Sequence, residues 1–220
     1  MKKAKTSSWD FLWYALYAFA GLGLEFVLIG IVEPLLFGKI NANDYSTSQR
    51  IIHWILTSVC WGITAGLLIK ASKNKSGFNV LSCDAVKKKN IIFSTAAVAV
   101  CIILNFFDWK TLKIIGEFKS KEPIIFIFQY VYYIFEVILV FLVVAFGQKF
   151  AEDLLKKKSN IPFGGIVLCC TWGTIHILSK GSIYTGIGVM VFALIYGIMY
   201  ILLNRNAKLS YIAMLLAFII

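Results

Sequence analysis

Six stretches of the sequence are apolar for long enough to cross the hydrocarbon core of a bilayer, which takes about 17–25 helical residues. A seventh stretch, Leu209 to Ile220, is shorter and is expected to stop before the far interface. The pattern predicts an all-α, polytopic transmembrane helical bundle with about six to seven helices. The six long stretches run approximately from Phe11 to Phe37, Ile51 to Ile69, Ile91 to Phe107, Ile124 to Phe146, Ile161 to Leu178 and Tyr184 to Leu203.

The composition agrees with a membrane protein and excludes a soluble globular domain. Hydrophobic residues make up 60% of the chain and the mean hydropathy is +0.81, whereas soluble domains are about 45–50% apolar. No internal repeat, low-complexity tract or long linker divides the sequence. We therefore expect residues 1–220 to form a single integral membrane domain.

Positive charge is concentrated in the short loops between the apolar stretches. The chain has 22 Lys and Arg against 11 Asp and Glu. A cytoplasmic amino terminus places about two-thirds of the basic residues in inner segments, and this bias predicts that orientation. The same distribution indicates contact with membrane lipids rather than with nucleic acid. The many lysines, isoleucines and phenylalanines suit an AT-rich bacterial genome, so a bacterial plasma membrane is the expected location.

The segment from Phe141 to Leu178 contains polar residues at spacings that suggest a site. Gln148 and Glu152 are four residues apart and therefore share one helical face. They lie near the expected inner interface. Their polarity is explained either by a solvated helix end or by a role in binding.

The next helix is expected to be capped by Ser159 or Asn160 and to hold Pro162 in its first turn. Its otherwise apolar sequence includes Trp172 and His176, which are again four residues apart. An imidazole in a lipid-embedded helix needs a partner and is a candidate for function. Trp172 is interpreted either as a packing aromatic or as the wall of a substrate site.

At these residues the chain resembles the CPBP or Abi membrane proteins, which include the type II CAAX prenyl endopeptidases and bacteriocin-processing or immunity relatives. The second motif of that family, an aromatic residue, three spacers and a histidine, is matched by Trp172 and His176. The resemblance covers about residues 141–220. It implies an intramembrane site at which a glutamate takes a proton from water while histidine and asparagine stabilise the oxyanion.

Two other motifs of the family are missing from the sequence. The first, two glutamates followed by an arginine, falls on Val144 to Lys149, where both glutamates are absent and lysine replaces arginine. The third, a histidine followed by an asparagine or aspartate, has no counterpart in Ser210 to Ile220. The resemblance therefore implies a degenerate member, a pseudoprotease.

Three carboxylates lie within the apolar stretches, at Glu25, Glu33 and Glu136. Each costs about 2.5–3.5 kcal/mol or more in the membrane unless it is paired, protonated or facing water. Glu33 and His53 occupy the outer ends of consecutive stretches and so share a depth. We predict a hydrogen bond between them, with either a structural or a functional role.

Glu25 lies about 12 Å deeper than Glu33 along the same helix. Its neighbours Gly21, Gly23 and Gly30 would let another helix approach closely. Glu25 is therefore interpreted as a packing-site carboxylate, and the alternative is that it lines a cavity.

Glu136 lies in the middle of the fourth stretch, and Gln129 and Tyr133 precede it on much the same helical face. This polar stripe is either an internal hydrogen-bond network or includes the carboxylate that activates water opposite His176. The separation of Glu136 from His176 is longer than in the family motif. The two interpretations predict separate structural roles or one shared site.

Three functions remain open from the sequence. The first is a degenerate relative that binds a peptide, a lipidated peptide or a membrane partner, with an immunity or regulatory role. The second is an active intramembrane CAAX-type peptidase that uses Glu136 and His176, and the third is a small transporter or transporter subunit. No cofactor is expected, and two histidines exclude an all-histidine metal site. The candidate binding residues are Glu25, Glu33, His53, Gln148, Glu152 and Trp172.

Overall fold

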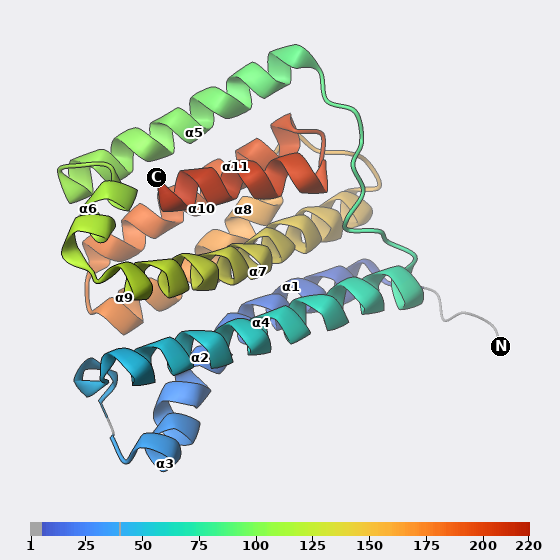
Figure 1. Cartoon of the computed structure of the whole chain (residues 1–220). Helices are drawn as coiled ribbons and strands as arrows, with labels where there is room; N and C mark the ends of the chain where they lie inside the picture. The colour runs from blue at the N-terminus through green and yellow to red at the C-terminus, as the bar shows by residue number, and fades with distance from the viewer. Residues whose placement is uncertain (1–5, 40) are drawn as a thin grey trace.

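The chain folds into α-helices joined by short loops, as the computed structural model of residues 6–39 and 41–220 describes (Figure 1). Six helical segments within these residues are long and apolar enough to cross a membrane. The protein is therefore an all-α, multi-pass helical bundle, as the apolar pattern predicts. The six segments are Ser8–Phe37 (α1 to α3), Thr47–Ser76 (α4), Lys88–Trp109 (α5), Pro123–Leu155 (α7), Phe163–Lys180 (α8 and α9) and Ile183–Leu202 (α10).

Two of the six segments contain a π-helical turn. Such a turn holds one extra residue and so moves the following side chains by about 100° around the helix axis. The first turn directly precedes Glu33 and the second lies shortly before His176. The two segments are composed of α1 (Ser8–Leu22), α2 (Leu24–Val27), η1 (Leu28–Val32) and α3 (Glu33–Phe37), and of α8 (Phe163–Leu168), η3 (Cys169–Gly173) and α9 (Thr174–Lys180).

The helices extend beyond the apolar stretches because local signals set their ends. α4 begins with a capping box in which the side chains of Ser46 and Gln49 each accept the other residue's backbone N–H. It ends at Gly77, whose φ of 67° is the left-handed conformation that glycine adopts without strain. The result is a helix longer than the apolar run of residues 51–69.

Three shorter elements complete the described chain. η2 (Ala42–Asp44) connects α3 to α4, and α11 (Ala207–Ile219) is the short apolar helix expected near the end of the chain. α6 (Lys113–Ser120) is an amphipathic helix between α5 and α7 that the apolar pattern does not predict.

α7 runs through the centre of the bundle (Figure 1). α1 and α4 pack against one side of it, α8 and α11 pack against another, and α5 lies at the periphery against α10 and α11. All residues from Phe141 to Gln148 are buried, because this part of α7 is surrounded by helices. Large apolar side chains such as Leu35, Ile63 and Ile92 point outward, as lipid contact requires.

The backbone of α8 comes into direct contact with its two neighbours at glycines. A Cβ atom added to Gly164 would lie 2.0 Å from the carbonyl oxygen of Val144 in α7. A Cβ atom on Gly165 would lie 2.7 Å from the carbonyl oxygen of Ala193 in α10. Small residues permit this close approach between membrane helices.

The glycines near Glu25 only partly follow the packing interpretation. A Cβ atom on Gly21 would lie 2.7 Å from Cγ2 of Thr64, so α4 does approach closely there. A Cβ atom added to Gly30 would meet nothing within 4 Å in the described structure, and one added to Gly23 would meet only the carbonyl of Ala20 in the preceding turn. The expected close approach at Gly23 and Gly30 is therefore wrong.

A hydrogen-bonded cluster around Glu152 holds the loop that follows α7. Oε1 of Glu152 accepts from Nε2 of Gln148 at 2.9 Å, from the backbone N–H of Ser159 at 3.1 Å, and from Nη2 of Arg205. The same Arg205 nitrogen donates to the carbonyl of Ser159 at 2.8 Å. Gln148 is 1% exposed. The interpretation of Gln148 and Glu152 as a solvated helix end is therefore wrong.

Gln148 also provides the cap of α8. Its Oε1 accepts the backbone N–H of Gly164 at 3.1 Å, which is the bond that an N-cap side chain normally makes. Pro162 precedes the helix instead of lying in its first turn, and the hydroxyl of Ser159 accepts a bond within the loop. The expectation that Ser159 or Asn160 caps α8 is wrong, because α7 supplies the cap from a distance.

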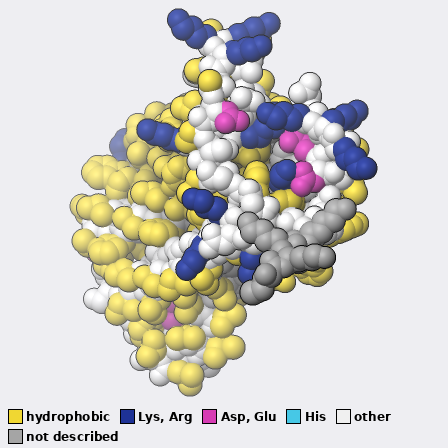
Figure 2. Space-filling view, turned by 90° about the vertical axis from the view of Figure 1, so that its right-hand side faces the viewer, with side chains coloured by type: hydrophobic (Ala, Val, Ile, Leu, Met, Phe, Trp, Pro, Cys, Tyr) yellow, Lys and Arg dark blue, Asp and Glu magenta, His cyan; other side chains and the backbone are white. Residues whose placement is uncertain are grey.

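The loops at the amino-terminal end of the bundle are basic. Figure 2 looks onto this end and shows Lys and Arg side chains gathered there beside apolar flanks. Lys2, Lys3 and Lys5, which the sequence analysis assigned to the same side, lie outside the described residues. Described basic residues in the segments assigned to this side include Lys73, Lys75, Lys87 to Lys89, Lys156 to Lys158, Arg205 and Lys208.

Candidate functional site: an aromatic cavity with carboxylates

A cavity of about 820 Å³ lies around the beginning of α7. This part of α7 is in the half of the bundle farther from the start of α1 (Figure 1). The volume of the cavity is within the range of about 300–1,000 Å³ that small-ligand sites occupy. Aromatic side chains and groups of both charges line it, which suits an amphipathic ligand. The main aromatic and polar lining residues are Trp54, Trp61, Trp109, Trp172, Tyr132, Tyr133, Glu25, Glu136, His176, Lys113, Lys180, Asn105 and Gln129.

Packed aromatic rings form much of the cavity wall. The ring centroids of Trp61 and Tyr132 are 4.7 Å apart, and those of Trp54 and Tyr132 are 6.3 Å apart. Trp172 meets the ring of His176 edge-on, with centroids 5.0 Å apart. Such pairs stabilise one another beyond their burial alone. Trp172 therefore packs against a neighbouring ring and also lines the cavity.

Glu136 and His176 both line this cavity. Nδ1 of His176 lies 2.7 Å from the carbonyl oxygen of Trp172. Because a carbonyl only accepts, Nδ1 carries the proton and Nε2 remains free. Among the described residues, Glu136 makes no hydrogen bond or ion pair, and none joins it to His176. The fold places the two side chains in one cavity without pairing them.

The position of His176 depends on the π-helical turn before it. Trp172 lies within η3 and is 5% exposed, and Gly173 ends that turn against α10. A Cβ atom on Gly173 would lie 2.4 Å from Cγ of Met190. This tight packing holds α9 beside the cavity.

His53 lies between two carboxylates at one side of the cavity. Nδ1 of His53 is 2.7 Å from Oε1 of Glu33, and Nε2 is 3.4 Å from Oε1 of Glu25. The hydroxyl of Tyr132 donates to the same Glu25 oxygen at 2.8 Å. The predicted contact between Glu33 and His53 is confirmed. Glu25 lines the cavity, which was the alternative to its interpretation as a packing residue.

The polar side chains of Gln129 and Tyr133 on α7 form hydrogen bonds with Glu117 of α6 and not with Glu136. Oε1 of Glu117 accepts from Lys121 at 3.0 Å, from Gln129 at 3.1 Å and from the hydroxyl of Tyr133 at 2.9 Å. Glu117 is 2% exposed. Glu117 lies outside the apolar stretches, so its charge does not mark it as a site residue in the sequence. The available signal was the spacing of four between Glu117 and Lys121, which is typical of an ion pair on one helical face.

Lys113 is a second residue that the sequence pattern does not indicate, and unlike Glu117 it lines the cavity. Its ammonium lies 4.8 Å from the ring centroid of Tyr133 and 4.2 Å from that of Phe218, and it donates to the carbonyl of Phe218 at 2.8 Å. Burial lowers the pKa of Lys113, and the carboxylates of Glu117 and Glu136 oppose that shift. The cavity wall thus already holds one ammonium group on aromatic faces.

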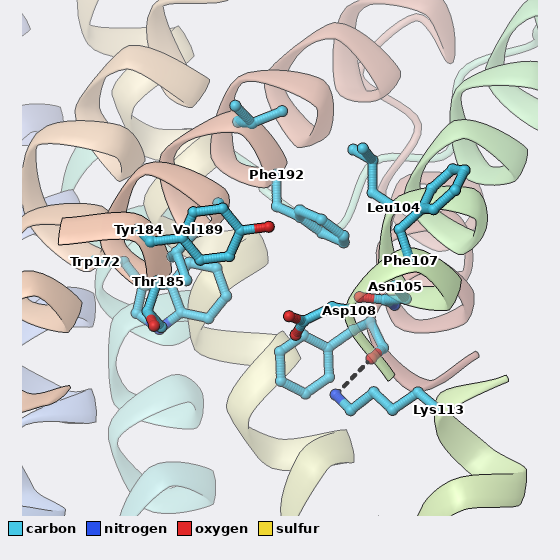
Figure 3. A pocket seen from close by; sticks show the side chains of 13 residues that line it. Leu104, Asn105, Phe107, Asp108, Lys113, Trp172, Tyr184, Thr185, Val189 and Phe192 are labelled. Atoms are coloured by element: carbon cyan, nitrogen blue, oxygen red, sulfur yellow. Dashed lines mark hydrogen bonds between the residues drawn. The ribbon is translucent and has the colours of Figure 1, made fainter. Parts of the chain in front are cut away.

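A smaller hollow of about 330 Å³ adjoins the cavity (Figure 3). Asn105 and Lys113 line both spaces. Figure 3 shows Leu104 of α5 and Phe192 of α10 on the apolar side of the hollow, with Asp108 and Lys113 on its polar side. An apolar ligand group could therefore extend from the cavity between α5 and α10.

Four of the six candidate binding residues do not line the cavity. Glu33 and His53 lie beside it, where His53 contacts the lining residue Glu25, and the other two lie at the opposite end of α7. Gln148 and Glu152 occur near the end of α7, and their hydrogen bonds connect parts of the chain to one another. They do not line the cavity. Their arrangement supports a structural role at the opposite end of the bundle.

Comparison of the chain with protein-family models, with curated proteins and with solved structures finds no match. The multi-pass helical architecture therefore rests on the sequence and the structure.

Proposed function

We propose that this chain is a membrane-embedded binding protein that holds a peptide or a lipidated peptide in the 820 Å³ cavity without cleaving it. The observation that carries this proposal is a cavity with aromatic walls and charges of both signs in which, among the described residues, no hydrogen bond or ion pair joins Glu136 to His176. Glu25 and Glu136 suit a cationic ligand group, and Lys113 and Lys180 suit a carboxylate. The adjoining hollow offers space for an apolar chain.

The resemblance to the CPBP or Abi proteins supports the same proposal. Trp172 and His176 supply one motif of that family, and both lie at the cavity. The glutamate pair and the final histidine motif are missing from the sequence. A relative that keeps the cavity and lacks most of the catalytic groups fits a role in immunity or regulation.

Binding and cleavage are separated by one experiment on protein in lipid nanodiscs. A farnesylated tetrapeptide with a fluorophore is titrated, with fluorescence anisotropy as the binding signal and mass spectrometry as the test for products. We expect saturable binding and no product. Glu136→Gln is expected to weaken binding about tenfold, because one charge-assisted hydrogen bond worth about 1.5 kcal/mol is lost.

Asp153→Asn is the matched control for Glu136→Gln, because it makes the same kind of change on the same helix and outside the cavity. Equal weakening by both variants, or no saturable binding, contradicts the proposal. A cleaved product that is lost in His176→Ala supports the second candidate, an active CAAX-type peptidase. The observation that favours this candidate is that Glu136 and His176 share one cavity.

The transporter hypothesis also gains an observation. In this hypothesis Glu25, Glu33, Glu136 and His176 form a proton or substrate path. Glu25, Glu136 and His176 line the cavity, and Glu33 is connected to Glu25 through His53. Transport also needs a path to the opposite side of the bundle, which the cavity by itself does not provide, so we rank this hypothesis third.

We propose that the amino terminus is cytoplasmic and that the protein resides in a bacterial plasma membrane. The basic residues at the amino-terminal end support this orientation, because such residues are retained on the cytoplasmic side. Cys83 is an exposed free cysteine between α4 and α5, at the same end of the bundle, so its accessibility to a thiol reagent tests the orientation.

Labelling with a membrane-impermeant maleimide tests the orientation. We expect Cys83 to react only after cells are permeabilised. Asn43→Cys, in η2 at the other end of the bundle, is expected to react in intact cells. Reaction of Cys83 in intact cells, with Asn43→Cys protected, would reverse the proposed orientation.

A further inference from the structure

The surroundings of His53 favour a doubly protonated, cationic ring. Both ring nitrogens face carboxylate oxygens, those of Glu33 at 2.7 Å and Glu25 at 3.4 Å. A carboxylate oxygen only accepts, and a neutral imidazole has a single N–H group. Both contacts are favourable together when both nitrogens carry protons. The hydroxyl of Tyr132 donates to Oε1 of Glu25 and so stabilises the ionised carboxylate, which favours placing the extra proton on the ring.

The two carboxylates differ in their access to water. Glu33 is 0% exposed, and its Oε2 is buried without a hydrogen-bond partner among the described residues. Tyr45 lies on that sealed side, where burial, followed by the Glu33 carboxylate, raises its pKa to about 12. The side chain of Glu25 is 25% exposed and lines the cavity.

We infer that Glu25, His53 and Glu33 form a proton-binding site that exchanges its proton with the cavity through Glu25. When the proton leaves, one ring nitrogen presents a lone pair to a carboxylate. The longer contact, from Nε2 to Glu25, is the one that opens. The net charge of the three groups changes from −1 to −2, since an imidazolium between two carboxylates becomes a neutral ring between them.

Other titratable groups lie around the site. From α7, Tyr132 faces Glu25, and the cavity that Glu25 lines also holds Glu136, Lys113, His176 and Lys180. Tyr45 faces Glu33 from the segment before α4, and Arg50 is the basic residue one turn before His53 on α4 itself. Proton loss therefore increases the negative charge that the cavity presents to a ligand. This inference needs no ligand and stands apart from the proposed binding of a peptide.

The presence of only two histidines makes the site directly observable. The measurement is 15N NMR of the imidazole rings in protein labelled at histidine and held in nanodiscs, recorded across a pH series. At neutral pH we expect both ring nitrogens of His53 to be protonated, while His176 is protonated at Nδ1 alone. As the pH rises, His53 is expected to change to a single protonated nitrogen.

Two variants complete the experiment. His53→Gln removes one set of imidazole resonances and so assigns the remaining set to His176, and Glu25→Gln tests the route through Glu25. Glu25→Gln keeps a group of similar shape and is expected to leave His53 with one protonated nitrogen at neutral pH, with His176 unchanged as the internal control. A wild-type His53 that carries one ring proton at neutral pH overturns the inference. An imidazolium that persists in Glu25→Gln overturns the exchange through Glu25.

Discussion

Replacing Gly164 by alanine is expected to destabilise the protein by about 3 kcal/mol, at the upper end of the usual cost of overpacking. The new Cβ would lie 2.0 Å from the carbonyl oxygen of Val144. That oxygen belongs to the backbone of the buried central helix, so it cannot move aside as a flexible side chain would. The midpoint of thermal unfolding in detergent measures the effect, together with the yield of monodisperse protein.

Gly66→Ala is the matched control. Gly66 lies within α4, and a Cβ atom there meets nothing within 4 Å. Alanine is the better helix former by about 1 kcal/mol in water, so this variant is expected to equal or exceed the wild type in stability. If Gly164→Ala unfolds at the same temperature as Gly66→Ala, the result contradicts the close contact between α8 and α7.

Replacing Arg205 by methionine is expected to cost about 3–5 kcal/mol, because it leaves a buried carboxylate without its cation. The side chains of Glu152 and Arg205 are 12% and 16% exposed, respectively. Arg205 also donates to the carbonyl of Ser159, so its loss releases the loop between α7 and α8. Thermal unfolding of the purified variant in detergent measures the loss.

A double variant shows whether Arg205→Met loses stability because it leaves an unpaired charge or because it removes packing. Arg205→Met combined with Glu152→Met removes both charges, and it is expected to recover most of the stability lost in Arg205→Met alone. Asp153→Asn removes a more exposed ion pair one residue further along α7 and is expected to cost less than about 1 kcal/mol. A double variant that is no more stable than Arg205→Met contradicts the role assigned to the pair.

The candidate site combines polar residues that the sequence indicated with others that it did not. Glu25, Glu136 and His176 stood out because charge and imidazole are costly inside apolar helices. Lys113 and Glu117 did not, because they lie in a short polar segment that reads as an ordinary loop. Their partners come from α7 and α11, which follow them in the chain, and no local pattern reveals those contacts.

Two π-helical turns are a further reason why side-chain contacts cannot be derived from the sequence pattern alone. The extra residue in η1 and in η3 rotates the side chains of Glu33 and of α9 relative to an uninterrupted α-helix. Face assignments based on a period of 3.6 residues fail beyond such a turn. The contact of Glu33 with His53 was nevertheless predictable, since it required only a common depth in the membrane.

The sequence by itself determined the six apolar membrane-crossing segments and the order of the polar residues along them, because apolar run length is a property of adjacent residues. It did not determine α6 or the cap of α8. Nor did it determine which polar groups meet. Gln148 caps α8, and His53 contacts Glu25 as well as Glu33. Such contacts depend on how each helix is rotated about its axis and how closely its neighbours approach. The tertiary structure alone decided these, through contacts such as that of Gly164 with Val144.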